Sequence, residues 1–244
     1  MSCVLVYNDE GVCNHSLEQL LEALKEEGYS PQTVDSFQII HNDWEEHTRL
    51  IIFPGGRDIP YHESLSTKGT ERIRKFVEQG GCYFGICAGA YFGCASFVFE
   101  EGSPLEITAN RDLKFFPGQG CGPAYGTHLF QYDSSEGARL AELQLKDNSR
   151  VSVFYEGGCL FKNAETYSNV NVYARYADIP NKAPAIVICR VGEGKAILSG
   201  VHPEYSPSRL DTDDIYLKKL VPSMKLEEKK RRLLFQSLLN EAFQ

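Results

Sequence analysis

Short apolar runs alternate with helical patterns in the first part of the chain. Four runs have the length and composition of buried strands: Cys3–Tyr7, Thr33–Phe37, Leu50–Phe53 and Cys82–Phe84. The leucines between Leu17 and Leu24 form a helical stripe, which Ser16 precedes. Gln19 completes a capping box with Ser16, and Gly28 ends the predicted helix.

Two further helices are predicted, one before and one after the last of these strands. The first, Thr70–Gln79, has an apolar face and ends at a pair of glycines. The second runs from Ala88 to Phe97. This alternation of strands and helices predicts an α/β fold, with a mostly parallel sheet that helices cover on both faces.

After Phe99 the pattern changes to short β-branched and aromatic runs separated by glycine and proline, which predict a β-rich insertion in the same core. The predicted strands are Leu129–Tyr132, Val151–Tyr155, Val170–Tyr176, Ala185–Cys189 and Ala196–Leu198. Gly192–Gly194 fits a hairpin turn, and Met224–Phe243 is predicted as a terminal helix. No linker or repeat interrupts the chain, so we expect a single domain over residues 1–244.

Composition and charge exclude several classes of function. The 244 residues are 42% hydrophobic and 24% charged, which is typical of a globular protein with a core. A net charge of −8 argues against nucleic acid or an anionic membrane as a partner. No apolar run approaches the roughly 20 residues of a membrane span. The N-terminus lacks the pattern of a signal peptide, and the eight cysteines are scattered without a CxxC pair. We therefore expect a cytoplasmic protein without a disulfide framework, a metal or a cofactor.

The segment Gly85-Ile86-Cys87-Ala88-Gly89 is the strongest indication of chemistry. It lies between a predicted strand and a predicted helix, and so sharp a turn exposes a nucleophile only when small residues flank it. The helix N-terminus behind Cys87 favours the thiolate, the form that attacks carbonyl groups. Taken alone, Cys87 is explained equally well as a small buried apolar residue.

Two other loops are predicted at the same carboxyl edge of the sheet, which is where α/β folds bind their ligands. Pro54-Gly55-Gly56 follows one strand, and Val201-His202-Pro203-Glu204 follows another. The backbone amides of Gly55, Gly56 and Ala88 are candidate donors to an oxyanion, because residues with small side chains let the backbone approach a substrate closely.

His202 and Glu204 suit the roles of base and orienting group for a cysteine nucleophile. Residues two apart in an extended segment point the same way, so the carboxylate of Glu204 is expected to hold the ring of His202. Singly, His202 fits an ordinary turn histidine, Glu204 a solvated acid and the glycine pair a tight turn. The three loops together at one edge make a catalytic arrangement the better interpretation.

The motifs P-G-G, G-x-C-x-G and a late H-P-E occur in this order in the class I glutamine amidotransferase superfamily, which the chain resembles. The resemblance implies a flavodoxin-like core, a Cys87–His202–Glu204 triad and an oxyanion hole at the glycine loop. Glutaminases of this superfamily carry a Gln four residues after the nucleophile. This chain has Tyr91 there, which argues against glutamine as the substrate.

The chain also resembles the N-terminal domain of eukaryotic biotin–protein ligases, a branch of the same superfamily. The shared stretches are Val4–Asn8, Phe53–Tyr61, Gly85–Gly93, Arg111–Gly118, Gly122–Tyr125, Ser135–Arg139 and Gly200–Glu204. The match is strongest over residues 3–205, which leaves 206–244 as a C-terminal helical tail. Nothing resembles the ligase catalytic domain, so biotin ligation is not expected. The resemblance implies a small-molecule substrate or ligand, and names a biotin ligase or a biotin-dependent enzyme as a candidate partner.

Five residues are candidate contacts to a substrate: Asp58, Tyr61, Tyr91, Arg111 and Tyr125. Asp58 and Tyr61 follow the glycine loop, whereas Arg111 and Tyr125 lie in the glycine-rich insertion. The guanidinium of Arg111 suits a substrate carboxylate, because it can form two parallel hydrogen bonds. The alternative is a local ion pair between Arg111 and Asp112, with the aromatic residues in the core.

Three functions fit these residues. The leading hypothesis is a cysteine hydrolase or acyl-transfer enzyme that acts on a small amide, ester or thioester through the triad. The second is a non-catalytic regulatory or binding module related to the biotin–protein ligase domains, which predicts a blocked or collapsed pocket. The third is a redox or carbonyl-scavenging protein in which Cys87 works without His202.

Overall fold

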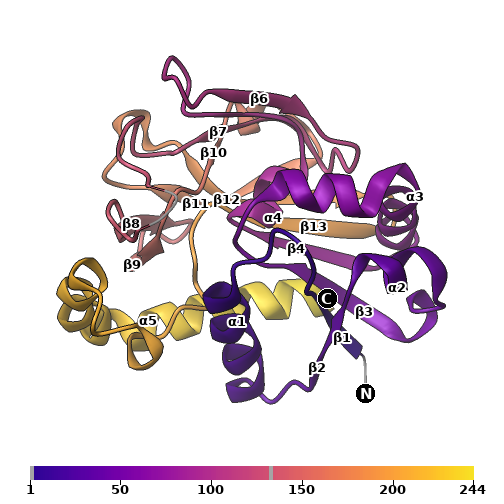
Figure 1. Ribbon diagram of the computed structural model, residues 1–244, viewed down its shortest axis with the longest axis horizontal. Helices are drawn as coiled ribbons and strands as arrows, with labels where there is room; N and C mark the ends of the chain where they lie inside the picture. The colour runs from indigo at the N-terminus through magenta and orange to yellow at the C-terminus, as the bar shows by residue number, and fades with distance from the viewer. Residues whose placement is uncertain (1–2, 132–133) are drawn as a thin grey trace.

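The computed structural model describes residues 3–131 and 134–244 (Figure 1), and its main sheet contains nine strands. They are β1 (Cys3–Tyr7), β2 (Pro31–Val34), β3 (Thr48–Phe53), β4 (Cys82–Ile86), β8 (Arg139–Leu145), β9 (Arg150–Tyr155), β11 (Val170–Tyr176), β12 (Pro184–Val191) and β13 (Gly194–Ser199). Their order in space is β2-β1-β3-β4-β13-β12-β11-β8-β9. Neighbours from β2 to β13 pair in parallel, and the rest of the sheet is antiparallel.

The described α-helices lie on both faces of this sheet. They are α1 (Asn14–Glu26), α2 (Ser36–His41), α3 (Asp58–Glu78), α4 (Ala88–Phe92) and α5 (Ile215–Phe243). Short 3₁₀ helices occur at Glu45–His47, Ala164–Thr166, Pro180–Lys182 and Pro207–Arg209. Helices α1 and α5 pack on one face, and α2, α3 and α4 pack on the other (Figure 1).

Alternation of side chains along the strands produces these two cores. In β3, Leu50 and Ile52 point toward α1 and α5, whereas Ile51 and Phe53 point toward α3 and α4. Both faces are buried, so the strand reads as a continuous apolar run rather than as an alternating one. The expected α/β fold of flavodoxin type, with helices on both faces, is confirmed.

A second, four-stranded sheet lies above the carboxyl side of the first in Figure 1. Its strands are β5 (Cys94–Phe99), β6 (Ile107–Asn110), β7 (Phe116–Gly122) and β10 (Leu160–Phe161), in the order β10-β7-β5-β6. The strands predicted after Phe99 lie elsewhere, because Val151–Tyr155, Val170–Tyr176, Ala185–Cys189 and Ala196–Leu198 form β9, β11, β12 and β13 of the main sheet. The strands of the second sheet were not predicted.

The predicted helix from Ala88 to Phe97 is wrong in its second half. Helix α4 ends at Phe92, and the following residues form β5. Gly93 between them packs against the main sheet, since a side chain there would come within 2.6 Å of Leu198. The backbone of β5 is satisfied by pairing with β6 and β7 in place of helical hydrogen bonds.

The start of α1 also differs from the prediction. The helix begins at Asn14, and its N-cap is Cys13, whose side chain makes no capping hydrogen bond. Ser16 is therefore inside the helix, and the predicted capping box with Gln19 does not form. Both side chains are buried. The Gln19 side chain makes a long-range contact instead of a cap, since its oxygen accepts from the amide of Ser206, 3.0 Å away.

Two other elements begin or end at residues that differ from the predicted ones. The predicted strand Thr33–Phe37 ends at Val34, because Asp35 caps α2 through its own side chain. Helix α3 begins at Asp58, earlier than predicted, and its backbone leaves the helical conformation at Ser66.

The C-terminal half shows two more differences and one confirmed turn. Helix α5 begins at Ile215, not at Met224, because Asp214 accepts from the first amides of the helix. Residues 129–131 of the predicted strand Leu129–Tyr132 are not in a strand, and Tyr132 lies outside the described residues. The hairpin turn between β12 and β13 is confirmed, with Gly192 at φ 57°. None of the helices in residues 3–131 and 134–244 has the length and apolar character needed to cross a membrane.

Phe84 of β4 links the sheet to α5 and provides a test of this packing. Its side chain is 0% exposed and its ring lies 6.5 Å from that of Phe235, centroid to centroid. We expect Phe84→Ala to lower the free energy of unfolding by about 3 to 5 kcal/mol in urea denaturation, because a cavity remains. The control is Phe37→Ala, whose side chain is 66% exposed, and which should change stability by no more than about 0.5 kcal/mol. Equal effects would contradict the assignment of the core.

Candidate functional site

Three loops meet at the carboxyl ends of neighbouring parallel strands. Pro54–Gly56 follows β3, Cys87 follows β4, and Val201–Glu204 follows β13. Because β4 pairs in parallel with both β3 and β13, their carboxyl ends lie side by side. The loops open onto a cavity of about 900 Å³ whose lining includes Gly55, Gly56, Cys87, Ala88 and His202.

The backbone at Cys87 adopts φ 51° and ψ −104°, a conformation that residues other than glycine rarely adopt. Hydrogen bonds to the end of β13 and to the loop after β3 hold this turn in place. The Cys87 amide donates to the carbonyl of Ser199 at 2.8 Å, and the Gly89 amide donates to that of Pro54 at 3.2 Å. The structure therefore has the sharp strand-to-helix turn that the sequence predicted at this cysteine.

Close backbone contacts explain the two glycines that flank the turn. A side chain at Gly85 would lie 2.2 Å from the carbonyl oxygen of Gly89, and one at Gly89 would lie 2.2 Å from that of Phe53. Either substitution would push the turn away from the strands beneath it. The small residues are needed for packing of backbone against backbone.

The side chain of Cys87 contacts the ring of His202. Cys87 is 8% exposed, and its thiol lies close enough to the ring of His202 to help raise the pKa of that ring. The thiol also lies 3.5 Å from the carbonyl oxygen of Glu156, to which it donates. Nδ1 of His202 lies 2.7 Å from Oε1 of Glu204, and the backbone amide of His202 donates to the carbonyl of Phe154 at 2.9 Å. The three side chains predicted to act together thus lie at one place, with a hydrogen bond between His202 and Glu204 and the thiol of Cys87 beside the ring.

The surroundings of His202 favour its protonated form. Burial acts to lower the pKa of His202, but the carboxylate of Glu204 and the hydrogen bond to Cys87 act in the opposite direction and prevail. The pKa of His202 is therefore raised well above its usual value. Burial also raises the pKa of Glu156, although the charge of His202 opposes this effect.

The three amides proposed as oxyanion donors differ in their contacts. The Gly55 amide donates to Oγ of Ser16 at 3.0 Å, whereas the amides of Gly56 and Ala88 make no hydrogen bond within the described residues. Gly55 also packs against the triad, because a side chain there would lie 2.7 Å from Cε1 of His202. Of the three, Gly56 and Ala88 have N–H groups available to a ligand.

Two of the five predicted substrate contacts line the cavity, Asp58 and Tyr91. The hydroxyl of Tyr91 donates to the carbonyl of Gly157 at 2.9 Å. Tyr61 does not line the cavity. It lies beneath the glycine loop, and its hydroxyl is 3.3 Å from the carbonyl oxygens of both Pro54 and Gly55.

Arg111 and Tyr125 also lie outside the cavity lining. Nε of Arg111 is paired with Oδ2 of Asp58 at 2.7 Å, and both side chains are buried. The suggested ion pair with Asp112 is therefore wrong, because the long-range partner on α3 occupies the guanidinium. The hydroxyl of Tyr125 donates at 2.8 Å to Asp178, which follows β11 of the main sheet.

Sequence reasoning missed several residues around Cys87. Ser16 and Glu156 contact the loops directly, and Phe130 lines the cavity. The Gly157-Gly158 pair after β9 signalled a close backbone approach, and it is the turn beside Glu156. Residues 118–125 of the glycine-rich insertion lie in β7 and the turn after it and do not line the cavity. Nowhere in the described residues do three or more His, Cys, Asp or Glu side chains gather as a metal site requires.

Comparison with known protein families gives a match over nearly the whole chain. The model of the family described as "Biotin-protein ligase, N terminal" matches residues 2–243. A Chlamydia muridarum protein described as uncharacterized is 42% identical over 98% of this chain and 96% of its own length. The biotin–protein ligase of Schizosaccharomyces pombe is 37% identical over 83% of this chain, which spans only 33% of that ligase.

Solved structures with the same fold include two glutamine amidotransferases. One matches 89% of this chain and 98% of its own, with a TM-score of 0.58 and 21% identity. The other, from Thermotoga maritima, matches 99% of this chain and 97% of its own, with a TM-score of 0.61 and 15% identity. At these identities the likeness shows the fold alone.

We expect Cys87 to react fastest of the eight thiols in limited labelling with iodoacetamide followed by peptide mapping. Burial raises the pKa of Cys82 and of Cys189 to about 12 in each case, and it also raises the pKa of Cys94 well above its usual value. These buried thiols are therefore protonated and unreactive at neutral pH.

Cys13 supplies the control for this labelling, because it is exposed and lines the same cavity. A Cys13→Ser variant should leave the labelling of Cys87 unchanged. Preferential labelling of Cys94 or Cys121 at neutral pH would rule out Cys87 as the reactive thiol.

The raised pKa of His202 predicts a pH-dependent stability. Since the folded-state pKa lies above the unfolded value of about 6.5, the stabilisation is complete below that value and is lost as the pH rises through the folded pKa. The test is urea denaturation over this range in a Cys87→Ala background, against the same protein with His202→Gln and Glu204→Gln. The difference in the free energy of unfolding between the Cys87→Ala protein and the one that also carries His202→Gln and Glu204→Gln should shrink as the pH rises. A difference that stays level or grows would contradict the pairing.

Proposed function

Since this chain belongs to the family of biotin–protein ligase N-terminal domains, we propose that it is a cysteine-dependent enzyme of the glutamine-amidotransferase type. It acts on the acyl group of a small amide, ester or thioester, by hydrolysis or by transfer. The observation that carries this proposal is the contact of a cysteine on a strained turn with a buried histidine, which a buried glutamate orients in turn. Nucleophilic catalysis needs a nucleophile, a base and an orienting group in this relation.

The tautomer of His202 follows from its partners. Glu204 is a carboxylate acceptor, so Nδ1 of His202 donates to it and leaves Nε2 for the thiol of Cys87. Because its surroundings favour protonated His202, Nε2 takes the proton of Cys87 before the reaction begins. In the first step the sulfur then bonds to the carbonyl carbon, and the carbonyl π electrons move to the oxygen. The developing negative charge is then stabilised by the N–H groups of Gly56 and Ala88.

The second half of the reaction releases the products. When the electrons return from the oxygen, the bond to the amine, alcohol or thiol breaks, and that group leaves with the proton from His202. The acyl group remains on Cys87 as a thioester. Water then attacks with His202 as base, which frees the acid and restores the thiol, or another nucleophile takes the acyl group instead.

The cavity wall opposite the triad favours an apolar acyl group. Phe97 and Phe99 of β5 line it together with Ile107 and Phe130. The ring of Tyr91 packs edge-on against both Phe97 and Phe99, with centroids 5.6 and 6.1 Å apart. Such a surface gains free energy by covering apolar groups and offers no partner to a substrate carboxylate. The pairing of Arg111 with Asp58 supports the same choice.

A second candidate function rests on the relatives. The chain corresponds to about a third of the Schizosaccharomyces pombe biotin–protein ligase, with 37% identity over the matched part. This supports a regulatory or binding module that acts on a ligase or on a biotin-dependent enzyme. This function predicts that the protein still affects biotin transfer when it carries Cys87→Ala. The enzymatic proposal predicts instead that Cys87→Ala abolishes turnover.

We expect turnover of short-chain acyl thioesters or esters, with little or no release of glutamate from glutamine. Cys87→Ala should lower this turnover by about three orders of magnitude or more, because the nucleophile is lost. Cys13→Ala, which removes another thiol of the same cavity, should leave it unchanged.

Tyr91 provides the specificity test, because a phenol does not offer the paired donor and acceptor that recognise an amide. Glutamate release by the wild-type protein, abolished in Cys87→Ala, would overturn the exclusion of glutamine. The absence of any Cys87-dependent turnover across amide, ester and thioester substrates would favour the regulatory function.

A further inference from the structure

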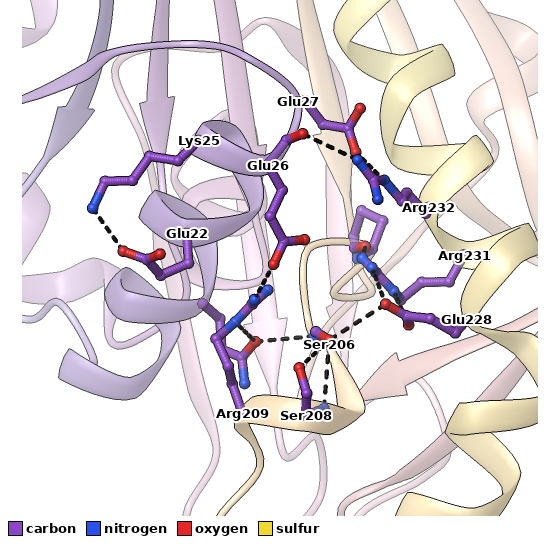
Figure 2. Close-up of polar contacts among 12 residues, drawn as sticks. Glu22, Lys25, Glu26, Glu27, Ser206, Ser208, Arg209, Glu228, Arg231 and Arg232 are labelled. Carbon is purple, nitrogen blue, oxygen red and sulfur yellow. Dashed lines mark hydrogen bonds and ion pairs between the residues drawn. The ribbon is translucent and has the colours of Figure 1, made fainter.

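Helix α5 reaches the segment that carries His202 and Glu204 through a single buried arginine. Arg231 is 3% exposed, and its Nη1 donates to the carbonyl oxygen of Pro203 at 2.5 Å. Pro203 stands between His202 and Glu204 in the chain, so this carbonyl belongs to the backbone that sets the spacing of their side chains. Figure 2 shows Arg231 directed from α5 toward this loop.

The charge of Arg231 is balanced inside the same contact. Its Nε and Nη2 donate to the two carboxylate oxygens of Glu228, each at 2.8 Å. Oε1 of Glu228 also accepts from the hydroxyl of Ser206 at 3.3 Å. The Glu228 side chain is 34% exposed whereas Arg231 is buried, so the carboxylate offsets the desolvation of the guanidinium and leaves Nη1 for the carbonyl of Pro203.

Helix α1 holds the other side of the segment. The side-chain oxygen of Gln19 accepts from the backbone amide of Ser206 at 3.0 Å and from Nε of Arg209 at 3.3 Å. Arg209 in turn is paired with Glu26 (Figure 2). Residues 202–206 are thus held between two helices, neither of which carries Cys87.

The segment depends on these contacts because it has little structure of its own. Residues 201–206 lie in neither a helix nor a strand. Glu204 is fully buried, and its Oε2 has no hydrogen-bond partner within the described residues. Within the described residues its carboxylate forms a hydrogen bond to His202 alone. Besides the hydrogen bond of the His202 amide to Phe154, the contact at Pro203 is what holds the backbone that carries both side chains. A displacement of this backbone would misalign the ring of His202 with the thiol of Cys87.

We propose that Arg231 is a positioning residue for the His202–Glu204 pair, and that the guanidinium contact with Pro203 sets the geometry in which His202 meets Cys87. This inference rests on the proposed function, although the placement of the pair is measurable without it. Arg231 does not line the cavity.

The test compares Arg231→Met with Arg232→Met. Arg232 also joins α5 to α1, through Glu27 at 2.5 Å, but it is exposed and does not touch residues 202–206. Arg231→Met should lower kcat for an acyl thioester about a hundredfold with KM nearly unchanged. Arg232→Met should change neither constant. The limb of the pH–rate profile that reports His202 should move in Arg231→Met only.

The proton NMR spectrum reports directly on the hydrogen bond between His202 and Glu204. The proton on Nδ1 of His202, bonded to Glu204, should give a downfield resonance in the wild type and in Arg232→Met, and should shift or vanish in Arg231→Met. Should Arg231→Met fail to fold, Arg231→Lys replaces it. Lysine keeps the charge and one donor toward Pro203 but loses the fork to Glu228, so kcat should fall between that of the wild type and that of His202→Gln, and the resonance should shift from its wild-type position.

The outcomes separate the two claims. If folded Arg231→Met or Arg231→Lys retains wild-type kcat, pH profile and resonance, the positioning role is wrong even when Cys87-dependent turnover is present. If no protein shows Cys87-dependent turnover, the proposed function is wrong, and the resonance alone decides whether Arg231 places the pair. A lower melting temperature with an unchanged resonance also rejects the positioning role.

Discussion

The strained backbone of Cys87 is the constraint on which the site depends. A residue other than glycine at φ 51° costs of order 1 to 3 kcal/mol, so the surroundings must hold it in place. Hydrogen bonds to the loops after β3 and β13 do this, and glycines on either side allow the backbone to come close enough. The same contacts that stabilise the turn bring the glycine loop and the His202 segment to it. The contacts that offset the strain at Cys87 are therefore the same contacts that pack the loops together and group their side chains.

The two faces of the sheet make different contributions to the site. On one face α4 follows Cys87 and α3 carries Asp58 and Tyr61 beneath the glycine loop. On the other face α1 and α5 hold the segment of His202 through Gln19 and Arg231. Cys87 and His202 thus depend on separate layers of the molecule, and the sheet order β3-β4-β13 is what joins them.

Motifs at the ends of strands could be predicted from the sequence, because their chemistry needs particular residue types at fixed spacing. The elbow at Cys87, the glycine loop and the His202–Glu204 spacing are local patterns, and the structure brings them together. Contacts between distant residues could not be predicted. Nothing local indicates that Ser16 accepts from Gly55, that Arg111 pairs with Asp58, or that one arginine of a basic run is buried on Pro203. The β5 strand was taken for helix because a short apolar run fits both periods, and only pairing with β6 and β7 decides.

Capture of a covalent intermediate tests the central claim most directly. The account holds that Cys87 accepts an acyl group and that His202 is needed to release it. Intact mass spectrometry after mixing with an acyl thioester, followed by peptide mapping, should find one acyl group on Cys87. In His202→Gln the adduct should form slowly but persist, because water is no longer activated. An adduct on another thiol such as Cys13, or none on Cys87 while the thioester is consumed, would contradict the account.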